Sequence, residues 1–220
     1  MKGEAIMHYK NILFDLDGTL TDSGEGIMNS GRYAFEQLKI EVPDVQELRK
    51  MVGPPLGTAF AFLGVPEEKI EEAIRLYRDH YNNQGGKYQN KVYPGIEEML
   101  RTLQASGCKL YVATSKPETL AKEILEKFKL DVFFEYIAGA TFDHSRESKG
   151  DVLRYLLEMT GNSENTVMVG DTNFDVIGSR QQNIPCIGVA WGYGAKEDMQ
   201  AAGAEKIVEN PEELLVYLKG

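Results

Sequence analysis

The sequence has few of the features that mark secreted, membrane-inserted or thiolate-rich proteins. It contains two cysteines among 220 residues, and Cys108 and Cys186 each open or lie within an apolar run. We therefore expect two small buried side chains rather than a disulfide or a metal pair. No run of about 18 apolar residues is present and the amino terminus lacks the apolar core of a signal peptide, so neither membrane insertion nor secretion is indicated. These absences predict a cytoplasmic protein with no membrane partner.

Positive charge is also scarce. The 24 Lys and Arg residues are outnumbered by 34 Asp and Glu residues, which gives a net charge of -10 and an isoelectric point near 4.9. Binding to a phosphate backbone relies on clustered Lys and Arg, so this balance predicts no nucleic-acid partner. The content of 42% hydrophobic and 26% charged residues is ordinary for a globular protein and excludes a disordered chain or a fibre.

Residues 11–20 predict a buried strand that is followed at once by carboxylates. Residues 11–14 are largely apolar, which is typical of a strand buried on both faces, and Asp15, Asp17 and Gly18 come directly after it. In an extended chain residues two apart point the same way, so Asp15 and Asp17 can converge at the carboxyl end of the strand. Open α/β sheets bind ligands at that edge. A solvated turn after a strand is the alternative interpretation of these residues taken alone.

The rest of the chain changes character twice. Residues 22–88 predict helices only, whereas from residue 96 helices alternate with short apolar strands, a pattern that favours a mostly parallel sheet covered by helices. The helices expected in the first region are 23–39, 44–51, 56–63 and 66–82. The strands expected in the second are 108–113, 136–140, 166–169, 184–190 and 206–208, and its helices are 96–106, 118–128, 150–159, 175–182 and 211–218. We predict an α/β core of residues 1–21 and 89–220, with a small all-helical domain, residues 22–88, inserted after the first strand.

Two further strand ends carry polar side chains. Thr114 and Ser115 follow one buried strand and precede a helix, an arrangement that offers a hydroxyl and backbone N–H groups to an anion, although Thr114 alone is equally consistent with a plain helix cap. Asp171 and Asp175 follow another strand. The four carboxylates at the ends of this strand and of the first strand, including Asp15 and Asp17, repel one another unless a cation is present. Mg²⁺, which prefers oxygen ligands, is a cation that can bind them.

Lys149 lies between these motifs, at the head of a helix where a loop returns to the same edge of the sheet. A surface lysine is the default explanation for any single lysine. At this place, however, a fixed cation can neutralise both a carboxylate and a phosphoryl oxygen.

These residues together resemble the four motifs of the haloacid dehalogenase superfamily of phosphohydrolases, in the family's order. Asp15-Leu16-Asp17-Gly18-Thr19-Leu20 is similar to the first motif, Thr114 to the second, Lys149 to the third, and Gly170-Asp171 with Asp175 to the fourth. The resemblance covers nearly the entire chain and implies a Rossmann-like core with a cap domain.

The resemblance implies a role for each of these residues. Asp15 would attack phosphorus and form an aspartyl-phosphate, and Asp17 would act first as general acid and then as general base. Thr114 and nearby N–H groups would hold the phosphoryl oxygens and Lys149 would offset charge. Mg²⁺ would be held by Asp15, by the main-chain carbonyl of Asp17 and by Asp171, with Asp175 near the metal or orienting its waters.

The second carboxylate narrows the expected reaction. An aspartate at position 17 favours a phosphatase or a phosphomutase, because dehalogenases of this family lack it and its transport ATPases carry threonine there. The insert resembles a cap that closes over the phosphate, and its Gly53-Pro54 loop resembles that of phosphoglycolate phosphatases, while an ordinary interhelical turn is the alternative. Arg49, just before the loop, is a candidate for binding a substrate carboxylate, and a solvated helix face explains it equally well.

We therefore predict a Mg²⁺-dependent phosphatase for small-molecule phosphomonoesters that most resembles phosphoglycolate phosphatases. The predicted substrate-binding residues are Ser115, Gly53, Pro54 and Arg49. A 5′-nucleotidase and a sugar phosphomutase of the β-phosphoglucomutase type are the catalytic alternatives, and a non-catalytic phosphate-binding protein is the alternative from another class. The expected partner is a small phosphate ester, and the expected assembly is a monomer or a homodimer.

Overall fold

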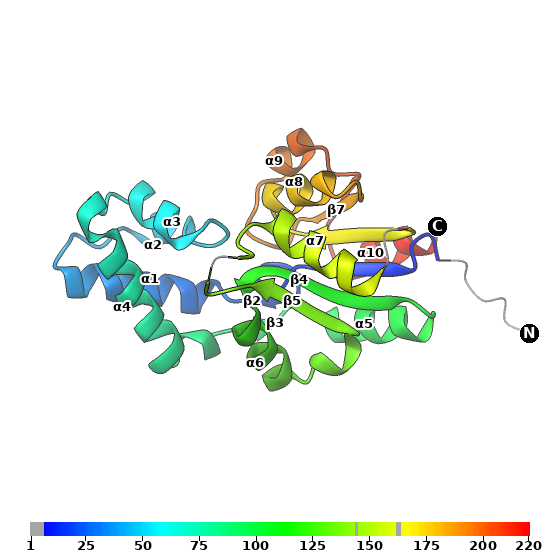
Figure 1. Cartoon of the computed structure of the whole chain (residues 1–220), viewed down its shortest axis with the longest axis horizontal. Helices are drawn as coiled ribbons and strands as arrows, with labels where there is room; N and C mark the ends of the chain where they lie inside the picture. The colour runs from blue at the N-terminus through cyan, green and yellow to red at the C-terminus, as the bar shows by residue number, and fades with distance from the viewer. Residues whose placement is uncertain (1–6, 144, 162–163) are drawn as a thin grey trace, which may run out of the picture. The chain divides into compact units, whose positions relative to one another are not determined.

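The computed structural model describes residues 7–143, 145–161 and 164–220, and Figure 1 labels its α-helices and several of its strands. The chain divides into two compact units. The first contains the residues up to Thr21 together with Val92–Gly220, and the second is Asp22–Lys91. The insert predicted from the sequence, residues 22–88, falls within the second unit.

The first unit is built on a six-stranded sheet in which every paired neighbour is parallel. The strands are β1 (Asn11–Phe14), β4 (Lys109–Pro117), β5 (Tyr136–Ala140), β6 (Thr166–Gly170), β7 (Cys186–Val189) and β8 (Lys206–Val208). Their order is β5-β4-β1-β6-β7-β8, which confirms the predicted α/β class. Phe14 pairs with Val112 of β4 and with Val169 of β6. The residues that follow β1 therefore emerge between the ends of β4 and β6.

Helices cover both faces of this sheet (Figure 1). The helices are α5 (Ile96–Ala105), α6 (Glu118–Phe128), α7 (Lys149–Thr160), α8 (Asn173–Gln181), α9 (Lys196–Ala202) and α10 (Pro211–Lys219), with a short 3₁₀ turn at Asp131–Phe133. Successive residues of a strand point to opposite faces. Ile12 and Phe14 accordingly join a core formed with α5, α6 and α10, whereas Leu13 joins a second core formed with α7, α8 and α9.

The second unit is helical, and its elements are α1 (Gly24–Leu38), α2 (Val45–Arg49), α3 (Leu56–Phe62) and α4 (Ile70–Asn83), with 3₁₀ turns at Glu67–Lys69 and Gly86–Tyr88. Its core is aromatic: the Phe35 and Phe60 rings lie 5.8 Å apart, and Tyr77 packs edge-on against Phe60. Two-residue strands β2 (Thr21–Asp22) and β3 (Lys91–Val92) pair where the chain passes between the units. The sequence did not predict them, because a strand of two residues has no measurable period.

The two cysteines lie in the interior of the protein. Cys108 and Cys186 are both buried and unbonded, as predicted. Among the residues that the structure describes, no helix combines the length and apolarity needed to cross a bilayer.

Candidate active site

Asp15 lies at the carboxyl end of the central strand and is buried. Its backbone N–H donates to the Val169 carbonyl oxygen at 2.9 Å, which extends the β1–β6 ladder by one residue. Its Oδ1 accepts a hydrogen bond from the Leu16 N–H at 2.7 Å and lies 2.9 Å from Lys149 Nζ. Both contacts of the carboxylate with the described protein are made by Oδ1, and Oδ2 makes none.

Asp171 follows β6 and is fully buried. Its Oδ2 accepts a hydrogen bond from the Tyr193 N–H at 2.8 Å, and its Oδ1 lies 3.3 Å from the Thr19 hydroxyl, which donates to it. Two glycines make room for it: a Cβ on Gly18 or on Gly192 would overlap the Asp171 side chain. Gly18 also has a φ of +84°, a conformation that only glycine adopts without strain.

Asp175 belongs to the first turn of α8, and both of its oxygens have partners. Oδ2 accepts hydrogen bonds from the Thr172 backbone N–H at 3.0 Å and from the Thr172 hydroxyl at 2.9 Å, which together with Thr172 form the capping box of the helix. Oδ1 lies 2.8 Å from Lys149 Nζ. The helix cap therefore fixes the direction in which Asp175 faces the lysine.

Lys149 is the centre of this network. Its side chain is 4% exposed, and Nζ donates to the Ala113 carbonyl oxygen at 2.8 Å in addition to its two carboxylate contacts. Burial alone would lower the pKa of Lys149, but the Asp15 and Asp175 carboxylates outweigh it and raise that pKa, so the ammonium stays charged. The ammonium thus joins the middle of β4 and the residue after β1 to α8. The stem of Lys149 passes Gly178 so closely that a Cβ there would lie 2.8 Å from its Cγ.

The three carboxylates exceed the one ammonium in charge. Ligand oxygens of Asp15, Asp171 and Asp175 lie within 4.8 Å of one another. Burial raises the pKa of Asp15 to about 6, against the opposing effect of Lys149, and burial together with Asp175 and Asp15 raises the pKa of Asp171 well above its usual range. A buried set of acids with one matching positive charge is suited to a further cation with hard oxygen ligands, so the residues present fit Mg²⁺.

Asp17 pairs with a different lysine from the one that contacts Asp15 and Asp175. Its Oδ2 is 2.9 Å from Lys116 Nζ, and its Oδ1 is buried without a hydrogen-bond partner among the described residues. The strand β4 continues to Pro117 rather than ending at residue 113, so Thr114 lies within it and does not follow it. Thr114 is buried, and its Oγ1 accepts a hydrogen bond from the Lys116 N–H at 3.2 Å. Ser115 is exposed on the same strand. The two predicted hydroxyls thus lie on the strand that also carries the partner of Asp17.

The remaining predicted residues belong to the second unit. Arg49 is the last residue of α2 and is exposed. Gly53, with a φ of +110°, and Pro54 lie in the turn between α2 and α3. Their roles in substrate binding stay predictions.

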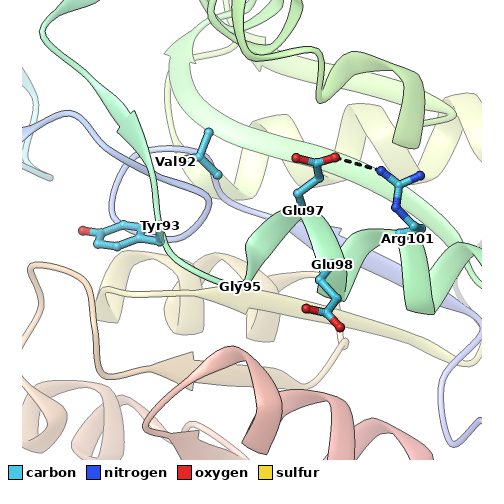
Figure 2. Close-up of a pocket in the computed structure, with 6 residues that line it drawn as sticks. All are labelled: Val92, Tyr93, Gly95, Glu97, Glu98 and Arg101. Carbon is cyan, nitrogen blue, oxygen red and sulfur yellow. Dashed lines mark hydrogen bonds and ion pairs between the residues drawn. The ribbon is translucent and has the colours of Figure 1, made fainter.

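A shallow pocket of about 410 Å³ lies elsewhere on the first unit (Figure 2). Its lining residues are Val92, Tyr93, Gly95, Glu97, Glu98 and Arg101. Arg101 is engaged by Glu97 at 2.8 Å, and Glu98 adds a second carboxylate. This pocket contains none of the residues of the carboxylate network, and its acidic lining does not suit a phosphate ester.

The structure adds site residues that the sequence analysis did not single out. Lys116 comes two residues after Thr114, so the alternation of an extended strand could have indicated that it lies on the same side. The Tyr193 N–H and the Ala113 carbonyl are backbone groups, which have no signature in the sequence. Gly178 is a helical glycine whose close approach to Lys149 becomes visible only when α7 and α8 pack.

An α/β fold with a carboxylate network at the carboxyl end of its central strand defines the general class of the protein as a Rossmann-like enzyme. Residues 12–189 match the model of the haloacid dehalogenase-like hydrolases. The chain belongs to that family, which confirms the resemblance drawn from the four motifs.

Several curated proteins are similar over most of the chain. A 5′-nucleotidase of Pseudomonas aeruginosa is 40% identical over 200 residues, which are 90% of each chain. A phosphoglycolate phosphatase of Agrobacterium fabrum is 31% identical over 82% of this chain and 80% of its own. A tyrosine-protein kinase, PtkA, of Mycobacterium tuberculosis is 42% identical over 83% of this chain but 62% of its own length.

The fold is shared with solved structures. The crystal structure of a predicted phosphatase from Clostridium acetobutylicum has a TM-score of 0.89, an identity of 44%, and coverage of 95% of this chain and 97% of that one. The likeness extends over both units of the chain.

Proposed function

We propose that this protein is a Mg²⁺-dependent phosphatase that hydrolyses small-molecule phosphomonoesters through an aspartyl-phosphate. The observation that carries the proposal is the set of contacts that the Asp15 carboxylate makes. Leu16 N–H and Lys149 hold Oδ1, and Oδ2 is left to attack. A carboxylate whose orientation is fixed by two donors is pre-organised as a nucleophile.

The first half of the reaction transfers the phosphoryl group to the protein. Asp15 Oδ2 attacks phosphorus, the bond from phosphorus to the ester oxygen breaks, and Asp17 gives a proton to the departing oxygen. In the second half Asp17 takes a proton from water, which attacks phosphorus and releases inorganic phosphate and the Asp15 carboxylate. The unpartnered Oδ1 of Asp17 suits both transfers, because a proton can be held there without breaking another contact.

The phosphoryl oxygens carry negative charge throughout. Thr114, Ser115 and the backbone N–H groups at the end of β4 are the proposed donors to these oxygens. Lys149 is already fixed by Asp15, Asp175 and the Ala113 carbonyl, so its charge requires no reorganisation when the phosphate arrives. Pre-organised charge of this kind typically contributes about 3 to 4 kcal/mol per donor to lowering the barrier.

Mg²⁺ is the proposed cofactor, with Asp15, Asp171 and the main-chain carbonyl of Asp17 as the groups that would hold it. When bound, the ion would supply positive charge beside the transferring phosphoryl group. Asp175 has both oxygens engaged by Thr172 and Lys149. We therefore propose that it acts near the metal mainly by fixing Lys149.

The second unit is the proposed cap, and its Arg49, Gly53 and Pro54 are the proposed contacts to the rest of the substrate. Two relatives frame the substrate class, since one is named a 5′-nucleotidase and another a phosphoglycolate phosphatase. Both names describe small phosphomonoesters. The 5′-nucleotidase is the more similar relative, so nucleoside 5′-monophosphates rank beside phosphoglycolate as the first substrates to test.

A substrate panel tests this proposal. The purified protein with Mg²⁺ is assayed for phosphate release from phosphoglycolate, nucleoside monophosphates, sugar phosphates, pyrophosphate and phosphotyrosine, with Asp15→Asn as the matched blank. We expect release from at least one small monoester, with loss of release in the variant and after removal of Mg²⁺. Equal rates for the parent and the blank would overturn the proposal. Conversion of glucose 1-phosphate to glucose 6-phosphate, rather than to glucose and phosphate, would identify the mutase instead.

A further inference from the structure

The contact between Lys116 and Asp17 is the least solvated lysine–carboxylate pair of the first unit outside the Lys149 network, among the pairs described. Lys116 Nζ lies 2.9 Å from Asp17 Oδ2, with 7% of the lysine side chain and 19% of the aspartate side chain exposed. Only Oδ2 of the carboxylate is engaged in this way, because Oδ1 is buried and has no hydrogen-bond partner among the described residues. The lysine thus fixes one oxygen, and the other has no hydrogen-bond partner among the described residues.

The backbone that carries Lys116 is itself tightly held. Its N–H donates to Thr114 Oγ1 at 3.2 Å. The pairing of β4 with β5 shifts register between Thr114 and Pro117, and at this irregularity Gly139 of β5 comes so close that a Cβ on it would lie 2.5 Å from the Lys116 carbonyl oxygen and 2.6 Å from the Glu118 Cα. The close approach leaves the Lys116 backbone little freedom to move.

Glu118, two residues after Lys116, is anchored by two cationic side chains, one from its own helix α6 and one from the loop between β5 and α7. Glu118 Oε2 lies 2.8 Å from Arg146 Nη2, and Glu118 Oε1 lies 2.7 Å from Lys122 Nζ. Arg146 in turn stacks on the Tyr155 ring, 3.8 Å from its centroid. A chain of contacts therefore runs from α7 through Arg146 and Glu118 to the backbone beside Lys116.

We propose that Lys116 is a positioning residue for Asp17, which it holds so that Oδ1 faces the reacting ester oxygen. The inference rests on the proposed function, because it assigns Asp17 the proton transfers described above. Asp17 follows the end of β1, just before the Gly18 turn, so the strand ladder does not restrain its side chain. Without the lysine the carboxylate can rotate among its staggered conformations, and a displacement of about 1 Å at a reacting group can cost about 10²-fold in rate.

The dependence of rate on the leaving group separates positioning of Asp17 from other roles of the lysine. A p-nitrophenyl ester leaves as a stable anion and needs little help from a proton donor, whereas an alkyl phosphate depends on one. Lys116→Met should therefore lower kcat for an alkyl phosphate by about 10²-fold. For p-nitrophenyl phosphate the rate of the first, phosphoryl-transfer step should change much less. That rate is measured as the pre-steady-state release of nitrophenol.

Three comparisons make the test decisive. Lys109→Met, at the exposed amino end of the same strand β4, should leave both rates unchanged. Lys116→Arg, which keeps the charge, should recover part of the alkyl phosphate rate. In an Asp17→Asn background Lys116→Met should cause little further loss, because the residue that it positions is already gone.

The outcomes are distinguishable from failure of the proposed function. If the parent protein hydrolyses no phosphate ester, the proposed function fails before Lys116 is tested. If the parent is active but Lys116→Met and Lys116→Gln slow both substrates equally, or raise KM alone, the lysine binds substrate or maintains the fold and the positioning role is overturned. Melting curves of each variant show whether a common loss comes from unfolding.

Discussion

The loss of stability on removing Lys149 can be predicted quantitatively, because among the described residues its ammonium is the one positive charge beside three buried carboxylates. Its Nζ lies 2.8–2.9 Å from Asp15 Oδ1, Asp175 Oδ1 and the Ala113 carbonyl oxygen, with 4% of the side chain exposed. Lys149→Met keeps a side chain of similar length and removes the charge. Breaking a buried ion pair from one side costs about 3 to 5 kcal/mol, because the remaining charges are left uncompensated.

The repulsion among the remaining acids supports this range. Two carboxylate charges within 4.8 Å of each other repel by about 3 kcal/mol or more at an effective dielectric constant of about 20. For a chain of this size a loss of 3 to 5 kcal/mol lowers the melting temperature by about 6 to 20 °C. We therefore expect the metal-free Lys149→Met variant to melt lower by that amount and to lose activity.

Thermal unfolding gives the melting temperature and urea unfolding gives the free energy of unfolding, and both are followed by tryptophan fluorescence. The chain has one tryptophan, and Trp191 packs against the core of the first unit and donates from Nε1 to the Thr19 carbonyl oxygen at 3.0 Å. Its emission therefore reports on the unit that contains the site. Measurements are made with a chelator and again with Mg²⁺ at about 100 times its dissociation constant, where one bound ion adds about 2.7 kcal/mol.

A compensating variant provides the control. Lys149→Met combined with Asp175→Asn removes both partners of one contact, and we expect it to be more stable than Lys149→Met alone while remaining inactive. The reasoning is refuted if metal-free Lys149→Met is as stable as the parent protein, or if the second substitution lowers stability further. Lys109→Met should unfold at the same urea concentration as the parent.

Three further predictions follow from the same contacts. Asp171→Asn should raise the melting temperature of the metal-free protein, because it removes one buried charge, and should abolish the increase that Mg²⁺ gives to the parent, as measured by differential scanning calorimetry. Gly178→Ala should push the stem of Lys149 aside and lower kcat by about 10²-fold. The far-ultraviolet circular dichroism of this variant should be unchanged. Full activity would show that α7 and α8 can separate without moving the lysine. Burial raises the pKa of Glu118, but the cations beside it, including Arg146, outweigh that effect and lower the pKa, so the group stabilises the fold above its unfolded value near 4.5 and this contribution is lost as the pH falls through the folded value. Arg146→Gln should cost about 1 to 2 kcal/mol at pH 7 and flatten the dependence of urea unfolding on pH below about 4.5, and an unchanged pH profile would contradict the contact.

Much of the core could be predicted because its strands are short, apolar and buried on both faces. The β5, β8 and α6 boundaries match the sequence prediction at both ends. The helix α9 was not predicted, because among its seven residues only Met199 is buried. An apolar period cannot be read from one buried position.

The start of α8 shows how a local rule was missed. The sequence analysis placed the helix at 175–182, whereas it begins at Asn173, because Thr172 caps it and Asp175 completes the capping box. A threonine followed three residues later by an acidic side chain is a recognised sequence pattern for the start of a helix. Treating Asp175 only as a candidate ligand hid its second role.

The two carboxylates of the first motif illustrate what the sequence could not provide. Alternation along an extended strand predicted that Asp15 and Asp17 converge at the carboxyl end of the strand, whereas β1 ends at Phe14 and the chain bends at Leu16. Their different partners, Lys149 for Asp15 and Lys116 for Asp17, depend on the order of strands in the sheet and on the Gly18 turn. These are contacts between segments far apart in the chain, so no local pattern encodes them.

The central claim is that Asp15 receives the phosphoryl group and that Asp17 activates the water that removes it. The most direct measurement is an acid quench of Asp17→Asn, mixed with p-nitrophenyl phosphate and Mg²⁺, followed by mass spectrometry of the peptide that contains Asp15. The substrate needs little help from an acid in the first step, whereas the second step lacks its base, so phosphate should accumulate on Asp15 with a burst of nitrophenol close to one equivalent per protein. Nitrophenol release with no burst and no phosphate on Asp15, or with phosphate on a different residue, would contradict the account.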